Sequence, residues 1–257
     1  MNQALTNGMT EKMLLTAGHQ SSQCGISPGT YVDNGEKRYR WAKISDASAS
    51  VGMVALRFNT AATDHFVLSA GKHLKSAYVD GQGGATNDRE IYLYGCSALT
   101  NTIPFEGGQF VVYSGVGGGY SYRVNRIEAG YTGCLITKVY LEEPIVVGLS
   151  TTTYARLQSN PYYGLVRTAW TYTGKVMGVF TDDVTASGWQ LIQTKGIAMV
   201  LTSGIVSAGR QIVPCAVLSG RVRRLSTTTA QSAQVIGRAM MAGYSAYCQA
   251  FIDVDID

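Results

Sequence analysis

The chain has 257 residues, only 15% of them charged, and a formal net charge of +4 at pH 7. Apart from the cluster Arg221-Val222-Arg223-Arg224 the basic residues are scattered, which argues against the concentrated positive surface of a nucleic-acid-binding protein. Thirty glycines, five prolines and this low charge indicate a β-rich protein with many tight turns, long enough for one large β domain or two smaller ones.

The beginning of the chain shows no sign of a signal peptide. The stretch MNQALTNGMTEKMLLTAGH lacks both a basic start and a continuous apolar run. No apolar run anywhere reaches the roughly 18 residues that a membrane-spanning helix needs. We therefore expect a protein without a membrane span or an export signal.

The cysteines and histidines give no metal-binding pattern. The five cysteines are far apart, with no Cys-x-x-Cys pair, which predicts small buried side chains in a reducing cytoplasm instead of a disulfide framework. The three histidines stand at no metal-ligand spacing with them, so neither a metal nor a cofactor is expected. The residues concerned are Cys24, Cys96, Cys134, Cys215 and Cys248, with His19, His65 and His73.

Residues 1–36 have little periodicity and are interpreted as an extended N-terminal arm. The turn formers Asp33-Asn34-Gly35 at its end predict a hairpin. In KRYRWAKI, which follows, Tyr39 and Trp41 alternate with smaller or charged residues at the period of a strand, and VGMVALRF predicts another.

The same pattern recurs after strands that begin with aromatic residues. A glycine and then a polar or sulphur-containing residue precede an apolar strand at Gly52, at Gly108 and at Gly209. We interpret the three copies, including residues 187–213, as one hairpin style used several times, with irregular spacing between copies. In residues 187–213 we expect Trp189 and Leu191 on one face of a strand, where Trp189 would anchor the packing. We also expect this stretch to supply a pair of strands to the core of a barrel.

Further along, YSGVGGGYSYRVNR predicts a long hairpin instead of a phosphate-binding loop, because a strand and not a helix follows the glycines.

Residues 148–168 contain many turn-forming residues and are the candidate linker. Six short β segments are expected beyond them. Helical periodicity is weak everywhere, and its best examples are EKMLLTAG near the start and AQSAQVIGRAMMAG at 230–243. The six segments are GKVMGVF, GWQLIQTKGIAMVL, RQIVPCAVL, GRVRRL, AQVIGRAMM and CQAFIDVDID.

No group of residues forms a catalytic pattern. In FIDVDID the aspartates could hold calcium, but period two favours a terminal strand with Ile252 and Val254 inward and the aspartates in water. Asp182-Asp183 is expected to shape a turn, and Glu142-Glu143 fails as an acid–base pair because adjacent strand residues face opposite ways. There is no Gly-x-Ser-x-Gly motif, so no catalytic, cofactor-binding or metal-binding residue is assigned.

Sixteen tyrosines raise the question of what their rings contact. They could stack on bases or sugars, but neither a basic stripe nor a carboxylate pair accompanies them, which favours rigid contact area at protein interfaces. The interleaved examples are Tyr120, Tyr122, Tyr131, Tyr140, Tyr162 and Tyr163.

The C-terminal third carries a resemblance to a known family. It combines a Gly-Val turn, an aromatic-led strand with a following glycine, and a closing Ile-Gly-x-Ala turn with a final strand. In this pattern it resembles the small β-barrel decoration, or cement, proteins on the heads of tailed phages. The matching residues are Gly178-Val179, Trp189, Gly196, Ile236-Gly237-Arg238-Ala239 and Phe251 to Val254.

The upstream part extends the resemblance. The segments GTYVDNGEKRYRWAKIS, IPFEGGQFVV and EEPIVVGLSTTTYARLQSNPYYGLV look like those of longer phage virion proteins with the same ending. The small decoration proteins lack this N-terminal half, which leaves a cement protein, a head fibre or another virion component open. The resemblance implies a homo-oligomer, often a trimer, on the outer capsid surface.

We therefore expect an all-β protein in which short antiparallel strands form a C-terminal β-barrel and a second β region. The expected parts are an arm at 1–36, a β-rich region at 37–150 and a decoration-like barrel at 151–257. The expected function is binding of the major capsid protein and stabilisation of the head in the virion, after synthesis in the host cytoplasm, without membrane or specific nucleic-acid partners. The alternatives are a head-fibre or tail-associated receptor- or glycan-binding module, using loops around Gly115 to Gly119 and Asn160 to Tyr163, and a glycosidase or esterase on a β scaffold.

Overall fold

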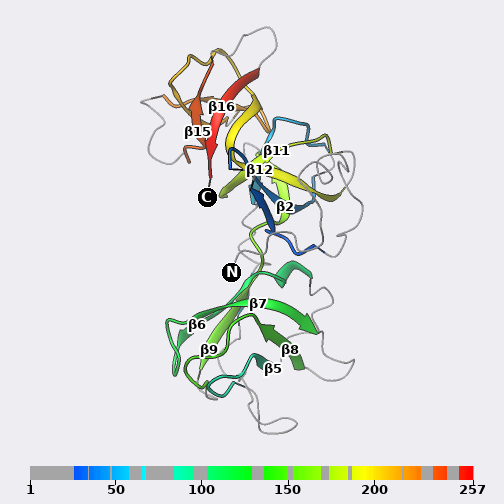
Figure 1. Ribbon diagram of the computed structural model, residues 1–257, viewed down its shortest axis with the longest axis vertical. Coiled ribbons are helices and arrows are strands. Elements are labelled where there is room, and N and C mark those ends of the chain that lie inside the picture. Colours follow the sequence, from blue (N-terminus) through cyan, green and yellow to red (C-terminus); the bar gives the residue numbers. More distant parts are fainter. Residues whose placement is uncertain are drawn as a thin grey trace. The chain divides into compact units, whose positions relative to one another are not determined.

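The computed structural model is all-β: apart from a short 3-10 helix, η1 (Ile103–Phe105), every regular element that it describes is a strand. The chain divides into two compact units, Met1–Asn59 with Pro161–Asp257 as unit 1 and Thr60–Asn160 as unit 2 (Figure 1). The structure describes residues 26–33, 35–46, 48–57, 65–67, 84–94, 103–128, 136–149, 153–168, 174–184, 187–215, 217–226, 234–241 and 249–256.

The strands of each unit come from distant parts of the sequence. Unit 1 holds β1 (Tyr31–Asp33), β2 (Arg38–Ile44), β3 (Val54–Arg57), β10 (Tyr163–Arg167), β11 (Val176–Phe180), β12 (Gly188–Leu201), β13 (Gln211–Pro214), β14 (Val222–Arg224), β15 (Gly237–Ala239) and β16 (Gln249–Asp255). Unit 2 holds β4 (His65–Val67), β5 (Glu90–Tyr94), β6 (Gln109–Ser114), β7 (Ser121–Glu128), β8 (Ile136–Leu141) and β9 (Tyr154–Gln158).

Five strands of unit 1 close into a barrel. Their order is β2-β10-β3-β11-β12, and a second ladder joins β12 back to β2. Only the β2–β10 pair is parallel. One face of each of the five strands points into the barrel interior, which is mostly apolar, although the buried polar residue Gln190 lies on the inward face of β12 opposite Ala42. The apolar residues include Ala42, Ile44, Ala55, Leu165, Met177, Phe180 and Ile192.

The opposite face of β2 and β12 carries the aromatic residues. Trp41 and Trp189 are 2% and 4% exposed and stack there, covered by Ile26 and Val32 from the chain before β2. The expected alternation in β12 is confirmed, since Trp189 and Leu191 share this outer cluster while Ile192 lies inside the barrel. The sequence prediction of Trp189 as a packing anchor is also confirmed.

β12 leaves the barrel halfway along its length. A register shift lies between Gln193 and Lys195, and Gly196 follows with a φ of +86°. The Gln193 amide donates to the carbonyl oxygens of Lys195 and Ile197, at 3.1 and 3.0 Å, and so fixes the irregular backbone. One continuous strand therefore serves both the barrel and the sheet beyond it, where it runs beside β16 (Figure 1).

The second part of unit 1 is the sheet β12-β16-β15-β13-β14, whose far edge returns to β12 through a bridge between Val222 and Thr202. Its inward residues pack with Val54 and Leu56 from the outer face of the barrel in one cluster. Barrel and sheet thus share a core within unit 1. The sheet contributes Ala198, Val200, Val206, Ile212, Val222, Ile236, Ala239, Ala250, Ile252, Val254 and Ile256.

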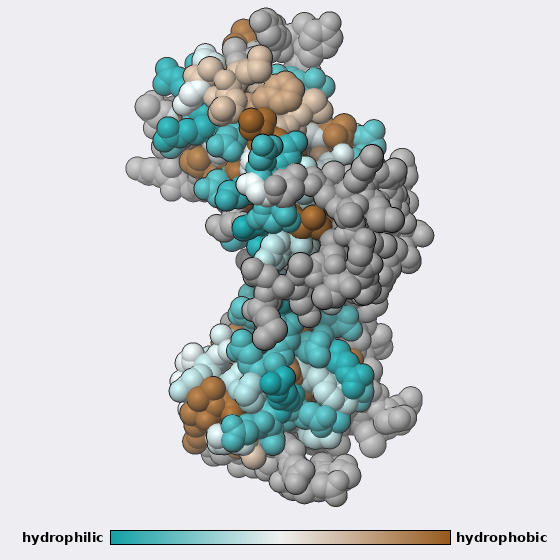
Figure 2. Space-filling view, viewed as in Figure 1, coloured by the Kyte–Doolittle hydropathy of each residue, from teal (hydrophilic) through white to brown (hydrophobic). Residues whose placement is uncertain are grey.

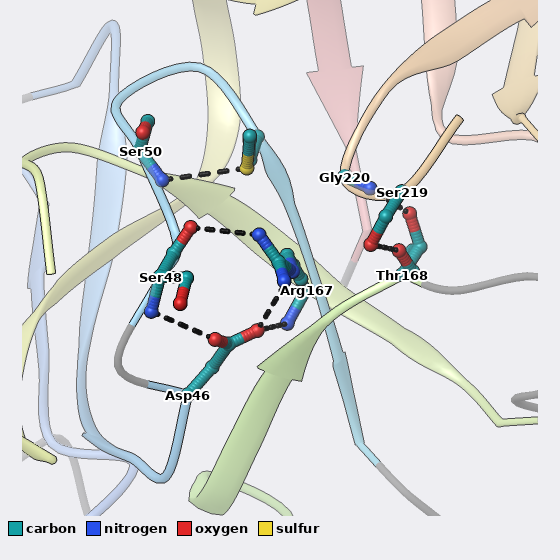
Figure 3. A network of polar contacts seen from close by, with 8 residues as sticks. Asp46, Ser48, Ser50, Arg167, Thr168, Ser219 and Gly220 are labelled. Atoms are coloured by element: carbon teal, nitrogen blue, oxygen red, sulfur yellow. Dashed lines mark hydrogen bonds and ion pairs between the residues drawn. The ribbon is translucent and has the colours of Figure 1, made fainter.

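A polar network ties the turn after β2 to the end of β10 (Figure 3). The Asp46 carboxylate accepts hydrogen bonds from the backbone N–H groups of Ser48 and Arg167, at 2.9 and 3.1 Å, and pairs with the Arg167 guanidinium at 3.3 Å. Nearby, the Ser219 hydroxyl donates to the Thr168 carbonyl oxygen at 2.6 Å. The contacts of Asp46 with Arg167 join the turn after β2 to β10, and the Ser219 hydrogen bond joins the loop before β14 to the residue that follows β10.

Unit 2 is a sheet with the order β4-β9-β6-β7-β8-β5. The glycine-rich segment joins β6 to the antiparallel β7, which confirms the predicted long hairpin. Inward residues of the strands form a separate core together with Ile145 and Phe105. The strand members are Ile91, Phe110, Val112, Tyr122, Val124, Ile127, Val139, Leu141, Ala155 and Leu157.

Several local predictions hold. The Asp33-Asn34-Gly35 hairpin is confirmed, with Tyr31 opposite Arg40 and Asp33 opposite Arg38 in the β1–β2 ladder. The six segments expected after the linker are β11 to β16. Ile252 and Val254 are buried and Asp253 and Asp255 exposed, as period two predicts.

The predicted division of the chain differs from the observed one. β2 and β3, expected in a region at 37–150, are barrel strands, because they hydrogen-bond to β10, β11 and β12. Residues 148–168 contain β9 and β10 and are not a linker, although the boundary between the units lies among them. In the arm predicted at 1–36, residues 31–33 form β1, and residues 1–25 lie outside the described residues.

The predicted hairpin pairing is wrong. The strands on either side of Gly52, Gly108 and Gly209 do not pair as hairpins, since β2–β3, β5–β6 and β12–β13 are not neighbours. The helical candidate at 230–243 contains β15, and EKMLLTAG lies outside the described residues.

Candidate interaction surfaces

The paired acids lie in turns. The Asp182 carboxylate accepts a hydrogen bond from the Asp183 N–H at 2.8 Å, and that of Asp183 accepts one from Val51 at 2.9 Å, so both shape the turn as predicted. Glu142 follows β8 and pairs with Arg123 at 3.4 Å.

Of the histidines and cysteines, only His65 and Cys215 lie in the described part of the chain. His65 is in β4, while His19 and His73 lie outside the described residues, as do Cys24, Cys96, Cys134 and Cys248. Cys215 is a buried free thiol. Burial raises its pKa, but hydrogen bonds from Ser203 and from the Leu218 and Val217 N–H groups outweigh burial and bring the pKa below its ordinary value.

The basic cluster lies at β14, with Arg221 directly before the strand and Arg223 and Arg224 within it. The Arg221 guanidinium donates to the Thr202 carbonyl oxygen at 3.1 Å, Arg223 is half-buried and Arg224 is exposed.

One face of the second sheet of unit 1 is unusually apolar. On β12 and β16 the outward positions carry Ile197, Met199, Leu201 and Phe251, and Met240 follows β15 directly. We call these five residues the β16 face. Ile197, Phe251 and Met240 are 49%, 47% and 52% exposed. Figure 2 shows light-brown side chains in the upper part of the view, over β16 as labelled in Figure 1.

Unit 2 has an apolar surface of its own around the β6–β7 turn. Tyr113, Val116, Tyr120 and Val146 are 43%, 46%, 40% and 57% exposed, and we call them the turn surface. The turn lies against residues 145–149, since Gly117 stands close to Leu149 and to the Val147 carbonyl oxygen. The Val146 N–H also donates to the Tyr122 hydroxyl, and the Tyr120 ring stacks on that of Tyr122. Dark-brown side chains gather on this unit in the lower part of Figure 2.

The tyrosines divide into buried, exposed and paired ones. Tyr122 and Tyr162 are buried, and Tyr131 lies outside the described residues. Tyr163 packs edge-on against Trp189, with ring centroids 5.9 Å apart. Of the interleaved set only Tyr120 presents a large exposed ring in the described part of the chain.

Tyr140 is held in a network of charges on the outer face of β5, β7 and β8. Lys138 and Arg126 lie over its ring, 4.5 and 4.0 Å from the centroid, and its hydroxyl donates to Glu128 at 3.0 Å. Lys138 also pairs with Glu90 at 2.8 Å. Glu90 above all, then Tyr140, raises the pKa of Lys138 above its ordinary value. The charged side chains on this face therefore contact one another, with Arg126 paired to Glu128 and Lys138 to Glu90.

The loops named for glycan binding have different outcomes. The turn from Gly115 to Gly119 stands beside exposed tyrosines, as a sugar-binding loop would require. Asn160, in contrast, is 2% exposed and its amide donates to the Glu106 carbonyl oxygen. Tyr162 is buried, with Arg40 over its ring.

Sequence reasoning missed Phe251 as a surface residue. The same alternation that placed Asp253 and Asp255 in water places Phe251 with them, because all three have the same parity in β16. A large aromatic residue on the outward side of an aspartate-bearing strand was therefore a readable signal for a contact surface.

Within the described residues no three His, Cys, Asp or Glu side chains come together as a metal site. In the same part of the chain no helix has the length and apolar character to cross a membrane. Comparison with protein-family models, with curated proteins and with solved structures finds no match for this chain.

Proposed function

We propose that this chain is a structural protein of a virus particle, a decoration protein that binds the outer surface of a tailed-phage head and stabilises it. The observation that carries the proposal is that each unit leaves large apolar side chains exposed, on the β16 face of unit 1 and on the turn surface of unit 2. The resemblance of the C-terminal third to phage decoration proteins gives this contact role its biological setting, with the major capsid protein as partner.

Two docking surfaces on one chain suit a protein that reinforces a lattice. Burial of apolar area contributes roughly 25 cal/mol per Å², reduced by the cost of ordering both partners. A rigid surface loses little further freedom on binding, and both surfaces here lie on or beside hydrogen-bonded strands. Contacts linked within one chain also gain from a high effective concentration once the first has formed.

The test uses heads of the phage that carries the gene, purified without this protein. Added chain is expected to sediment with the heads and to raise the temperature at which they release DNA. Val116→Lys combined with Val146→Lys should lower the bound amount, because it places charge in the turn surface. Val217→Lys is the matched control, since Val217 is an exposed valine outside both surfaces. Heads that bind no chain at all would exclude the decoration role.

A receptor- or glycan-binding module of a head fibre or tail is the second candidate. The exposed rings of Tyr113 and Tyr120 beside the glycine-rich turn favour it, because sugars stack on aromatic faces. A glycan array with wild-type chain and with Tyr120→Ala separates the two candidates. Glycan binding that Tyr120→Ala abolishes, without binding to heads, would select the module.

A further inference from the structure

Two residues of the ladder that closes the barrel bury polar atoms without partners. Gln190 is 1% exposed on the inward face of β12, and neither its amide oxygen nor its amide nitrogen has a hydrogen-bond partner in the part of the chain that the structure describes. Trp41 on β2 is 2% exposed, and its indole N–H has no acceptor among the same residues. Trp41 belongs to the outer aromatic cluster, so the two groups lie on opposite faces of one ladder. Thr202 and Arg223, in the second part of unit 1, hold one such atom each.

These groups make the closed barrel less stable than its apolar contacts alone would. A buried donor or acceptor that lacks a partner costs the free energy of taking it out of water. If β2 leaves β12, water reaches both the Gln190 amide and the Trp41 indole. Opening also exposes apolar area, including the stacked rings of Trp41 and Trp189, which keeps the closed barrel the dominant form. The unpartnered groups therefore narrow the free-energy difference between the closed and the opened barrel.

The position of β2 in the fold favours its release. Its pair with β10 is the parallel one of the barrel, and parallel pairs are slightly less stable per residue than antiparallel pairs. Both of its barrel ladders contain a register shift. β1 and β2 also precede the other strands of unit 1, so the connection at 45–53 joins them to the barrel strands that follow. The two strands can therefore leave together while the remaining barrel strands stay paired.

We propose that unit 1 opens between β2 and β12, with β1 and β2 leaving the barrel as its least stable part, and that Gln190 sets the population of the opened form. The Asp46 carboxylate, paired with Arg167 on β10, holds the connection after β2 and places the hinge there (Figure 3). An opened barrel presents the edges of β10 and β12, and unpaired strand edges accept further strands. The proposal concerns unit 1 alone and does not depend on binding to heads.

The first measurement is hydrogen exchange of the purified full chain in native buffer, followed by mass spectrometry. Peptides that cover β2 are expected to exchange faster than peptides that cover β3 and β11, after correction for the rates of the unfolded chain. The partial opening releases the amides of β2, whereas β3 and β11 stay paired with each other until more of unit 1 unfolds. Equal protection of the three strands would overturn the proposal.

The second measurement repeats the exchange with Gln190→Met, which keeps the length of the side chain and removes its polar atoms. Exchange of β2 should become about tenfold slower, because the closed barrel no longer buries an unpartnered amide. Gln190→Leu repeats the test with a shorter apolar side chain. An unchanged near-ultraviolet circular dichroism spectrum verifies that each variant is folded.

Gln193→Met is the matched control, because it makes the same replacement three residues along β12. The Gln193 amide donates to the carbonyl oxygens of Lys195 and Ile197, so its removal takes away hydrogen bonds that are formed. Exchange of β2 should not slow in this variant. A Gln190→Met chain in which β2 exchanges as fast as in the wild type, or faster, would overturn the proposal, since the amide would then have a partner in the closed barrel, such as an enclosed water molecule.

Discussion

Trp41 and Trp189 stack with ring centroids 6.3 Å apart and planes inclined by 13°. They come from β2 and β12, whose ladder closes the barrel between the two sequence segments of unit 1. The pair is covered by Ile26 and Val32, which precede β2. This aromatic contact therefore holds together parts of the chain that unit 2 separates in sequence.

Replacing Trp189 should destabilise unit 1 strongly. Trp189→Ala removes a ring that is 4% exposed and leaves a cavity, which lowers the free energy of unfolding by about 3–5 kcal/mol. Trp189→Phe should cost less because it keeps an aromatic ring against Trp41. Urea unfolding followed by near-ultraviolet circular dichroism measures the loss, with Tyr120→Ala on unit 2 as the control. A Trp189→Ala loss below about 1 kcal/mol would mean that the barrel closes without this pair.

Gly196 permits β12 to pass from the barrel into the second sheet. With a φ of +86°, its backbone is in the left-handed region, and an added Cβ would overlap the Glu36 carbonyl oxygen. Gly196→Ala is expected to lower the free energy of unfolding by at least about 2 kcal/mol. Gly204→Ala is the matched control, because nothing lies within 4 Å of its added Cβ. Equal unfolding midpoints for the two variants would contradict this account of Gly196.

The sequence predicts the strands better than their partners. Alternation identifies which residues of a strand share a face, as it did for Trp189 and Leu191 and for Ile252 and Val254. It says nothing about which strand lies alongside. β2 is followed in sequence by β3 but pairs with β1, β10 and β12, so the expected hairpin at Gly52 does not form. Non-local burial decides such pairing.

The sequence predicts one residue of the β16 face but not its neighbours on the adjacent strands. The parity of FIDVDID places Phe251 on the outward side with Asp253 and Asp255. That Met199 and Met240 flank Phe251 on the β16 face depends on the registers of the β12–β16 and β15–β16 ladders, and β12 lies far back in the chain. No local pattern contains those registers, so this face is visible only in the fold.

Asp46 should stabilise the folded chain by connecting the turn after β2 to β10. Its carboxylate accepts two backbone hydrogen bonds and pairs with Arg167, and its side chain is 13% exposed. Asp46→Ala leaves both N–H groups without this acceptor and should lower the free energy of unfolding by about 1–3 kcal/mol. Asp255→Ala, at an exposed strand position, is the control. Similar urea midpoints for the two variants would show that the Asp46 contacts contribute nothing net.

The β1–β2 hairpin should show a pH dependence set by Asp33. The Gly35 N–H donates to this carboxylate at 2.8 Å and Arg38 pairs with it at 2.9 Å. Gly35 first, then Arg38, holds the pKa of Asp33 below its ordinary value of 3.8. Because the pKa is lower in the folded chain, the ionised carboxylate favours folding fully above the unfolded-state pKa, and this contribution is lost as the pH falls through the folded-state pKa.

Wild type should therefore exceed Asp33→Asn in melting temperature at neutral pH, and the difference should shrink as the pH falls below about 4. Arg38→Gln removes the ion pair with Asp33 but keeps the Gly35 hydrogen bond. In this variant the pKa of Asp33 should therefore shift only part of the way back toward its ordinary value. The Gly35 amide signal in NMR follows the carboxylate directly, since the two groups are hydrogen-bonded. A melting difference that stays constant while the pH is lowered from neutral to well below 3.8 would have to come from something other than this ionisation, because the contribution is lost as the carboxylate becomes protonated in the folded chain.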